Sequence, residues 1–171
     1  MQAAMMEDFD LALDAKVRHF VEQEARLLDD RDFSSWLEMY TKDCVYWVPV
    51  SREQTSPRDG VAHFRDDYQI MLARTHRLLN PRSFSAEPPP VTCHVVSGVR
   101  IDEDAGDSLI VSSSQMVIEF RNRGRFEEDQ RVFGGRVIHH LARNGSKFAI
   151  TFKRIDLINA DSSFNALAAP F

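Results

Sequence analysis

The stretch DDRDFSSWLEMYTKDCVYWVPV, Asp29–Val50, decides how the chain begins to fold, because its hydrophobic pattern changes partway along. Asp32 stands where a helix N-cap would be, and the apolar residues that follow it recur at helical spacing. From Cys44 onward β-branched and aromatic residues dominate as far as Pro49, a pattern typical of a β-strand. The stretch therefore predicts a short helix that leads into a strand.

The segments on either side of this stretch extend the pattern. Apolar residues in Leu13–Leu28 recur at helical spacing and predict a first helix. Residues 51–60 have the composition of a loop, residues 61–64 predict a short strand, and residues 65–79 predict another helix. Residues 80–90 end in three consecutive prolines, so we expect an extended, irregular connection there.

The second half of the chain predicts long β-strands, at residues 91–101, 108–121, 130–143 and 147–159. In the second of these, Met116, Ile118 and Phe120 alternate with polar residues and share one face. Asn144-Gly145 predicts a hairpin turn between the last two strands. Gly134-Gly135, inside a strand, predicts a bulge or a sharp bend.

Helices followed by an antiparallel meander predict an α+β fold in one domain covering residues 1–171. We expect a curved antiparallel sheet that wraps around the N-terminal helices, as in a cone, and buries their apolar faces. Such a cone encloses a cavity that could bind a small ligand.

Composition excludes several classes of function. The chain has 171 residues, and its 21 basic against 26 acidic residues leave a formal net charge of −5, so nucleic-acid binding is not expected. Two cysteines cannot form a disulfide framework, and we expect both to be reduced thiols. No signal-peptide pattern is present, and no apolar run approaches the ~18 residues of a membrane span. We expect a cytoplasmic protein that has no membrane partner.

The histidines and cysteines are poorly spaced for a metal site. Cys93-His94 and His139-His140 are neighbours on predicted strands, so each pair points to opposite faces. His63 could meet Asp66 or Asp67, but no third ligand can be named. The remaining candidates also lack suitable neighbours: His19, His76 and Cys44. We therefore expect no metal ligand in this chain.

Acid–base chemistry in the cone is the alternative that the sequence leaves open. One buried carboxylate or histidine can suffice for a dehydratase or isomerase, and the candidates are Asp43, Tyr46, His63, His94 and Asp156. Each also has a structural explanation. Asp43 lies at a helix-to-strand turn, and buried aromatics usually fill a core. We interpret four aromatic residues as core or interface residues: Trp36, Tyr40, Tyr46 and Trp47. Cys44 and Cys93 are interpreted as small buried hydrophobes.

A cavity filled by Trp36, Phe64 and Met116 would exclude a substrate. An open cavity with Asp43 or His63 pointing into it would instead favour an enzyme. The sequence leaves open whether the cone is filled or open, and we expect no catalytic, cofactor-binding or metal-binding residue in this chain.

Three stretches resemble the small (β) subunit of aromatic-ring-hydroxylating dioxygenases, the Rieske non-haem iron oxygenases: EARLLDDRDFSSWLEMYTKDCVYWVPV, HFRDDYQIMLARTHRLL and SFSAEPPPVTCHVVSGVRI. Phe84, Glu87, Pro88, Pro89 and His94 match that family's loop pattern approximately, and the resemblance runs from about Val21 to Phe171. The chain departs from the pattern in PVTC, which replaces an arginine-containing segment, and in RTHRLLN.

The resemblance implies the cone fold shared with ketosteroid isomerase, scytalone dehydratase and SnoaL-like cyclases. It implies no cofactor in this chain and a larger α subunit that holds a Rieske iron–sulfur cluster and a mononuclear iron. Electrons would come from NAD(P)H through a reductase. It also implies self-association into a trimer within a hexamer of three α and three β subunits, for aromatic compound degradation. A stand-alone SnoaL-like dehydratase or isomerase is the alternative.

Overall fold

The computed structural model describes residues 10–80, 88–122, 128–162, 164, 167 and 170–171. Its helices are α1 (Leu11–Asp29), α2 (Phe33–Glu38) and α3 (Tyr68–Leu79). The predicted N-cap is confirmed, because the Asp32 side chain accepts a hydrogen bond from the backbone N–H of Ser35. The third helix begins later than predicted, since Asp67 is its N-cap and the two residues before it complete a strand.

Six strands form one sheet: β1 (Tyr40–Pro49), β2 (Ala62–Asp66), β3 (Val91–Asp104), β4 (Ser108–Asn122), β5 (Glu128–Asn144) and β6 (Lys147–Leu157). The strand order is β2-β1-β6-β5-β4-β3, so the predicted antiparallel meander is β3 to β6. The first strand joins the meander by pairing in parallel with β6. Of the predicted connection at 80–90, residues 81–87 lie outside the described residues.

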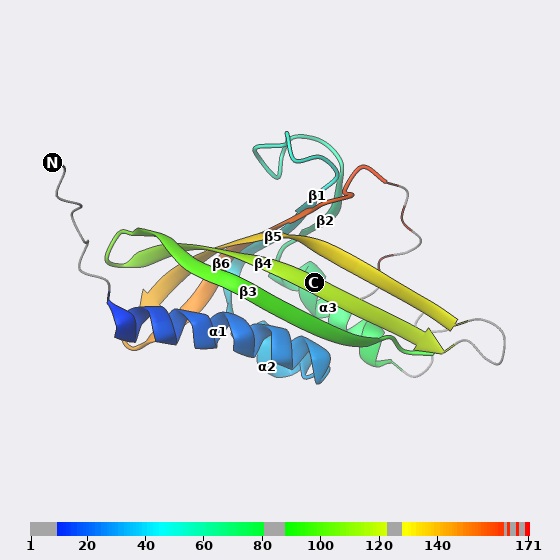
Figure 1. Cartoon of the computed structure of the whole chain (residues 1–171), viewed down its shortest axis with the longest axis horizontal. Coiled ribbons are helices and arrows are strands. Elements are labelled where there is room, and N and C mark those ends of the chain that lie inside the picture. The colour runs from blue at the N-terminus through cyan, green and yellow to red at the C-terminus, as the bar shows by residue number, and fades with distance from the viewer. Residues whose placement is uncertain (1–9, 81–87, 123–127, 163, 165–166, 168–169) are drawn as a thin grey trace, which may run out of the picture.

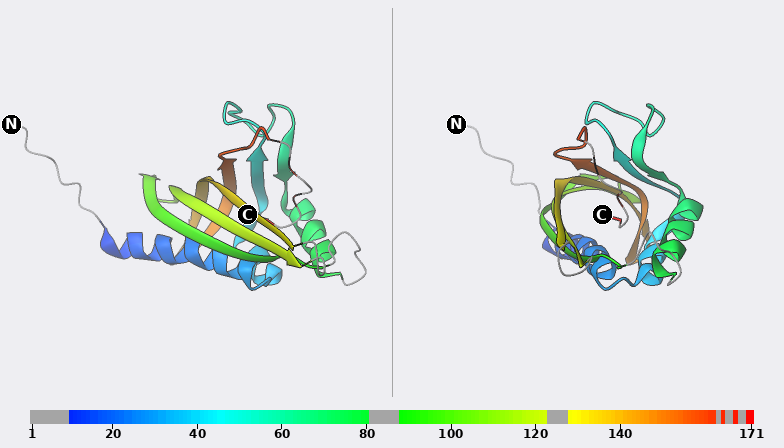
Figure 2. Two further views of the ribbon diagram at one scale, coloured as in Figure 1. Left: turned by 45° about the vertical axis from the view of Figure 1, so that its right-hand side comes forward. Right: turned by 90° about the vertical axis from the view of Figure 1, so that its right-hand side faces the viewer.

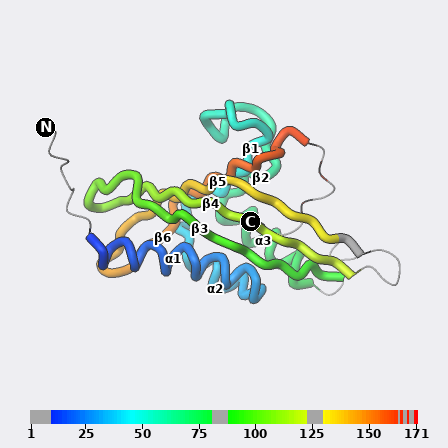
Figure 3. The backbone as a smooth tube through the Cα atoms, viewed as in Figure 1, coloured from blue at the N-terminus to red at the C-terminus, as the bar shows by residue number. Residues whose placement is uncertain are grey.

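The sheet curls into the expected cone. The meander strands run along the length of the molecule, and α1 lies alongside the edge strand β3 (Figures 1 and 3). Viewed from one end, strands and helices are arranged in a ring, and the C-terminus of the chain lies inside that ring (Figure 2). The α+β fold, a curved sheet with the N-terminal helices packed against it, is thereby confirmed.

The hairpin between β5 and β6 is confirmed, with Asn144 paired to Lys147 and Gly145 at a φ of 62° in the turn. The predicted bulge at Gly134-Gly135 is wrong, because pairing with β4 runs through both glycines without a register shift. Position 135 requires glycine for another reason. A Cβ there would lie 2.4 Å from the carbonyl oxygen of Asp156, so the backbones of β5 and β6 approach too closely for a side chain.

The aromatic residues of the opening stretch are core residues, as predicted: Trp36, Tyr40, Tyr46 and Trp47 are all buried. Phe64 and Cys44 are buried too. The predicted burial of Cys93 is wrong, because Cys93 is exposed. Met116, one of the residues that could have filled the cone, is 41% exposed. The alternation along each strand explains both, because the neighbours Val117 and His94 take the inward positions and send Met116 and Cys93 to the outer face.

Candidate functional site

The structure does not bring the five predicted acid–base residues together. Asp43 is exposed on β1. The ring of His63 contacts Phe164, and its Nε2 lies 2.7 Å from the carbonyl oxygen of Ala160. Asp156 accepts hydrogen bonds at 2.9 Å from its neighbour Arg154. Each of these groups has different neighbours, so they do not form a common site.

His94 has a close carboxylate partner, but at the seam between α1 and β3. Its Nδ1 lies 2.6 Å from Asp29, whose other oxygen accepts the backbone N–H of His94 at 2.9 Å. Thr92 donates a further bond to Asp29. Burial alone would raise the pKa of Asp29, but the hydrogen bonds from His94 lower it below its ordinary value. These contacts fasten the end of α1 to the edge strand.

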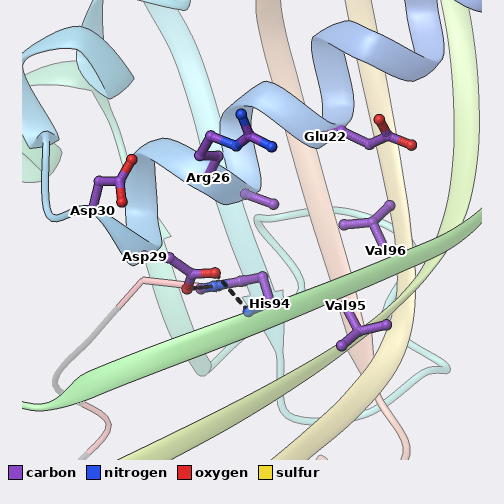
Figure 4. A pocket seen from close by; sticks show the side chains of 8 residues that line it. Glu22, Arg26, Asp29, Asp30, His94, Val95 and Val96 are labelled. Carbon is purple, nitrogen blue, oxygen red and sulfur yellow. Dashed lines mark hydrogen bonds and ion pairs between the residues drawn. The ribbon is translucent and has the colours of Figure 1, made fainter.

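A groove of about 540 Å³ lies beside this pair, lined on the helix side by Glu22 and Arg26 and on the strand side by Val96 (Figure 4). The geometry has the form of a base held by a carboxylate. The His94 side chain is nevertheless 0% exposed, so a substrate in the groove does not reach its ring. The pair is therefore structural in this conformation.

The polar centre of the cone is Glu24, a residue that sequence reasoning missed. Its carboxylate is 2% exposed and accepts hydrogen bonds from four side chains. Lys153 donates at 2.8 Å, Tyr40 at 2.5 Å and Trp36 at 3.2 Å, and His139 Nε2 lies 2.9 Å away. Because α1, α2, β1, β5 and β6 each supply one of these residues, the cluster joins the helices to the sheet. We call these five residues the Glu24 cluster.

Electrostatics keep the Glu24 cluster in one protonation state. Burial would raise the pKa of Glu24, yet the positive charge of Lys153 outweighs it and the pKa lies well below its ordinary value. Burial lowers the pKa of His139, which favours a neutral ring that donates from Nε2. Burial and the nearby carboxylate raise the pKa of Tyr40 well above its ordinary value. A carboxylate held ionised by four donors is a poor general base.

Phe171 closes the cone above this cluster. A main-chain oxygen of Phe171 accepts hydrogen bonds from Lys153 Nζ at 2.8 Å and from the Tyr46 hydroxyl at 3.0 Å. Its own N–H donates to the same hydroxyl at 2.8 Å. Tyr46, the one predicted acid–base candidate inside the cone, is therefore bonded to the chain itself, and burial raises its pKa well above the ordinary value.

A weak signal for the Glu24 cluster does exist in the sequence. Glu24 follows Val21 and precedes Leu28 at helical spacing, so it lies on the buried face of α1. Lys153 alternates with Ile155 in β6 and thus shares the inward face. A charged residue in an apolar series indicates that it has a partner in the interior, but the series does not identify the partner.

Metal ligands are not gathered anywhere in the described part of the chain. Among those residues no group of three or more His, Cys, Asp or Glu side chains could hold an ion. The described helices also include none that is long and apolar enough to cross a membrane.

Comparison with known proteins gives a consistent relationship. The family model described as ring hydroxylating beta subunit matches residues 23–162. The chain is 33% identical to the biphenyl 2,3-dioxygenase subunit beta of Rhodococcus jostii, over 79% of this chain and 77% of that one. It is 32% identical to a benzene 1,2-dioxygenase subunit beta of Pseudomonas putida, over 78% of this chain and 74% of that one.

Solved structures agree. The beta subunit of benzoate 1,2-dioxygenase from Burkholderia mallei superposes with a TM-score of 0.70 at 25% identity, covering 90% of this chain and 94% of that one. A scytalone dehydratase-like protein from Novosphingobium aromaticivorans has a TM-score of 0.66 at 13% identity, covering 94% of both chains, which shows the shared cone fold alone. With its sequence matched over most of its length, the chain belongs to the family of ring-hydroxylating dioxygenase β subunits.

Proposed function

We propose that this chain is a non-catalytic β subunit, which stabilises a ring-hydroxylating dioxygenase by packing against its larger α subunit. The observation that carries the proposal is that the charged groups and the Tyr46 hydroxyl inside the cone are engaged by the chain itself. Glu24, Lys153 and Tyr46 bond to one another or to Phe171, so their polar groups serve the fold. In this proposal the Rieske cluster and the mononuclear iron are held by the α subunit, and electrons arrive from NAD(P)H through a reductase.

The relatives named for biphenyl and benzene support a role in the degradation of aromatic compounds. The proposed assembly is a hexamer of three α and three β subunits, in which the β chains also contact one another. A stand-alone dehydratase or isomerase has less support. Its candidates Asp43, His63, His94 and Asp156 do not converge on one site, and each of the last three is engaged in a structural contact.

An exposed apolar face on the outside of the sheet supports a subunit role. Across β3, β4 and β5, Cys93 pairs with Ile118 and Ile118 pairs with Val132, while Val95 pairs with Met116 in the next row. Val132 is 53% exposed and Val95 45% exposed, although both are large hydrophobic residues. Contiguous exposed apolar residues of this kind mark protein interfaces. We assign this outer sheet face to contact with the α subunit, the permanent partner that family membership supports.

The test is purification of the N-terminally tagged chain from its own organism, with the mass of copurifying proteins and the iron content recorded. We expect a larger iron–sulfur protein in equal amount and a native mass that fits the hexamer. Val132→Asp should reduce its recovery, whereas Val61→Asp, at a loop position that is 76% exposed, should not. A metal-free homo-oligomer without a partner would contradict the proposal. Loss of self-association with the α subunit retained would instead assign the face to a second copy.

A further inference from the structure

A second groove, of about 380 Å³, lies between α1 and the hairpin that joins β5 to β6. The turn of that hairpin, drawn in orange, lies beside the N-terminal half of α1 (Figures 1 and 3). Lys16, Phe20 and Leu27 line the groove from the helix, and Lys147 and Phe148 line it from the hairpin. We call it the hairpin groove, and its volume is within the range of small-molecule sites.

The floor of the hairpin groove is apolar and recessed. The rings of Phe20 and Phe148 meet edge to face, with their centroids 5.7 Å apart. Together with Leu27 and Met39 they are partly buried and pack against the core. On the outer sheet face, in contrast, Val132 is 53% exposed. A protruding apolar face suits a flat protein partner, whereas a recessed one with a polar rim suits a small ligand.

Within the described part of the chain, the ionisable side chains that line the hairpin groove are all basic, although the whole chain has a formal net charge of −5. They are Lys16, His19 and Lys147. Both lysines are exposed, and neither has an ion-pair partner among the residues that the structure describes. A groove lined by charges of one sign attracts a ligand of the opposite sign, so the ligand that fits here is an anion.

The polarity of the groove changes along its length. On α1 the lining passes from Lys16 through Phe20 to Leu27, a span of about 16 Å at the helical rise. The basic end is therefore toward the N-terminus of the helix, and the apolar end is toward its C-terminus.

The hairpin has the same polarity as the helix. The N–H of Ile150 donates to the carbonyl oxygen of Met39 at 2.7 Å, which places that part of β6 at the apolar end. Two residues earlier Phe148 meets Phe20, and Lys147 comes before it, next to the turn. The two lysines, one on each side, consequently lie at the same end of the groove.

We propose that the hairpin groove binds an elongated amphipathic anion, a carboxylate on an unbranched apolar chain, which is the chemistry of a medium-chain fatty acid. The carboxylate lies at Lys16 and Lys147. The chain lies across Phe20 and Phe148 and points toward Leu27. This inference goes beyond the proposed role as a β subunit and does not depend on assembly with the α subunit.

The first test addresses the charge of the ligand. The purified full chain is titrated by calorimetry with octanoate and with 1-octanol, an uncharged probe of nearly the same shape. We expect octanoate to bind about fivefold more tightly, the gain of an exposed ion pair, and this preference should shrink as salt is added. Equal affinity of the unmodified chain for the two probes would refute recognition of an anion.

The same titrations locate the carboxylate. Lys16→Met/Lys147→Met keeps the apolar stems of both side chains and should remove the preference for octanoate. The matched control is Lys42→Met, at a lysine whose Nζ lies over the ring of Tyr68, and it should keep the preference. A double variant that still prefers octanoate as strongly as the unmodified chain would contradict the proposed position.

The second test addresses the apolar floor. Hexanoate lacks two of the methylenes of octanoate and should bind up to about 15-fold more weakly, at about fourfold for each buried methylene. Hexanoate that binds as tightly as octanoate would refute the contact between the chain of the ligand and the floor.

The third test fills the groove. Gln23 lines it between Phe20 and Leu27, so Gln23→Trp should abolish the binding of both octanoate and 1-octanol. The matched control is Gln69→Trp, at an exposed position of α3. Far-UV circular dichroism and the Tm establish that each variant is folded. Unchanged binding of octanoate to folded Gln23→Trp would overturn the proposal, as would the absence of octanoate binding to the unmodified chain.

Discussion

The ion pair between Glu24 and Lys153 gives the sharpest test of how the cone is held together. Both side chains are almost wholly buried, at 2% and 1% exposure, and their atoms lie 2.8 Å apart. Lys153→Met removes the positive charge but keeps much of the apolar stem, so Glu24 is left as a buried carboxylate with only uncharged donors. Breaking a buried pair in this way costs about 3–5 kcal/mol in the free energy of unfolding.

The assay is urea unfolding followed by far-UV circular dichroism at pH 7.5. The double variant Glu24→Gln/Lys153→Met should cost less than the sum of the two single variants by about 2 kcal/mol, because it leaves no isolated charge. Without Lys153, burial raises the pKa of Glu24, so the deficit of Lys153→Met should shrink as the pH falls and the carboxylate takes up a proton. The control Arg18→Met breaks an exposed pair with Asp14 and should change stability little.

A loss of less than about 1 kcal/mol in Lys153→Met would refute the reasoning, since a buried charge pair cannot be broken so cheaply. Strict additivity of the two single variants would refute it as well, because it would mean that the two charges do not interact.

Three further outcomes are expected. Burial lowers the pKa of His139, so stability should fall as the pH drops below about 6.5, where the unfolded chain takes up a proton, by at most about 1.4 kcal/mol per pH unit for this one group. Burial lowers the pKa of His140 as well, so His139→Gln should reduce the slope seen in urea unfolding without abolishing it, and an unchanged slope would contradict the prediction. Gly135→Ala forces a Cβ to 2.4 Å from a carbonyl oxygen and should lower the free energy of unfolding by about 1–3 kcal/mol, measured by thermal melting. Gly134→Ala should lower it little, because the nearest side-chain atom would lie 3.8 Å from the new Cβ. Equal effects of the two variants would rule out the clash. Cys93 is exposed, while burial raises the pKa of Cys44 to about 11, so a thiol reagent should label only Cys93 in the folded chain and both cysteines in urea. Formation of the complex with the α subunit should slow the labelling of Cys93. Rapid reaction of both thiols before unfolding would be inconsistent with the structure.

The sequence by itself determined the order and kind of the elements, because helical spacing, strand alternation and turn residues are local properties. Asp32 as an N-cap, the strand around Tyr46 and the hairpin at Gly145 all follow from neighbours a few residues away. The likeness to β subunits could also be read from short stretches, since their order and spacing are themselves sequence properties.

Only the tertiary structure decided which faces turn inward and which distant residues meet. Met116 and Val117 are neighbours with opposite surroundings, and that choice depends on how the whole sheet curls. Glu24 reaches Lys153 across 129 positions of sequence, and Tyr46 reaches Phe171 across 125. Such contacts depend on strand register and on the path of the chain through the cone, so a local pattern identifies the buried polar residue without identifying its partner.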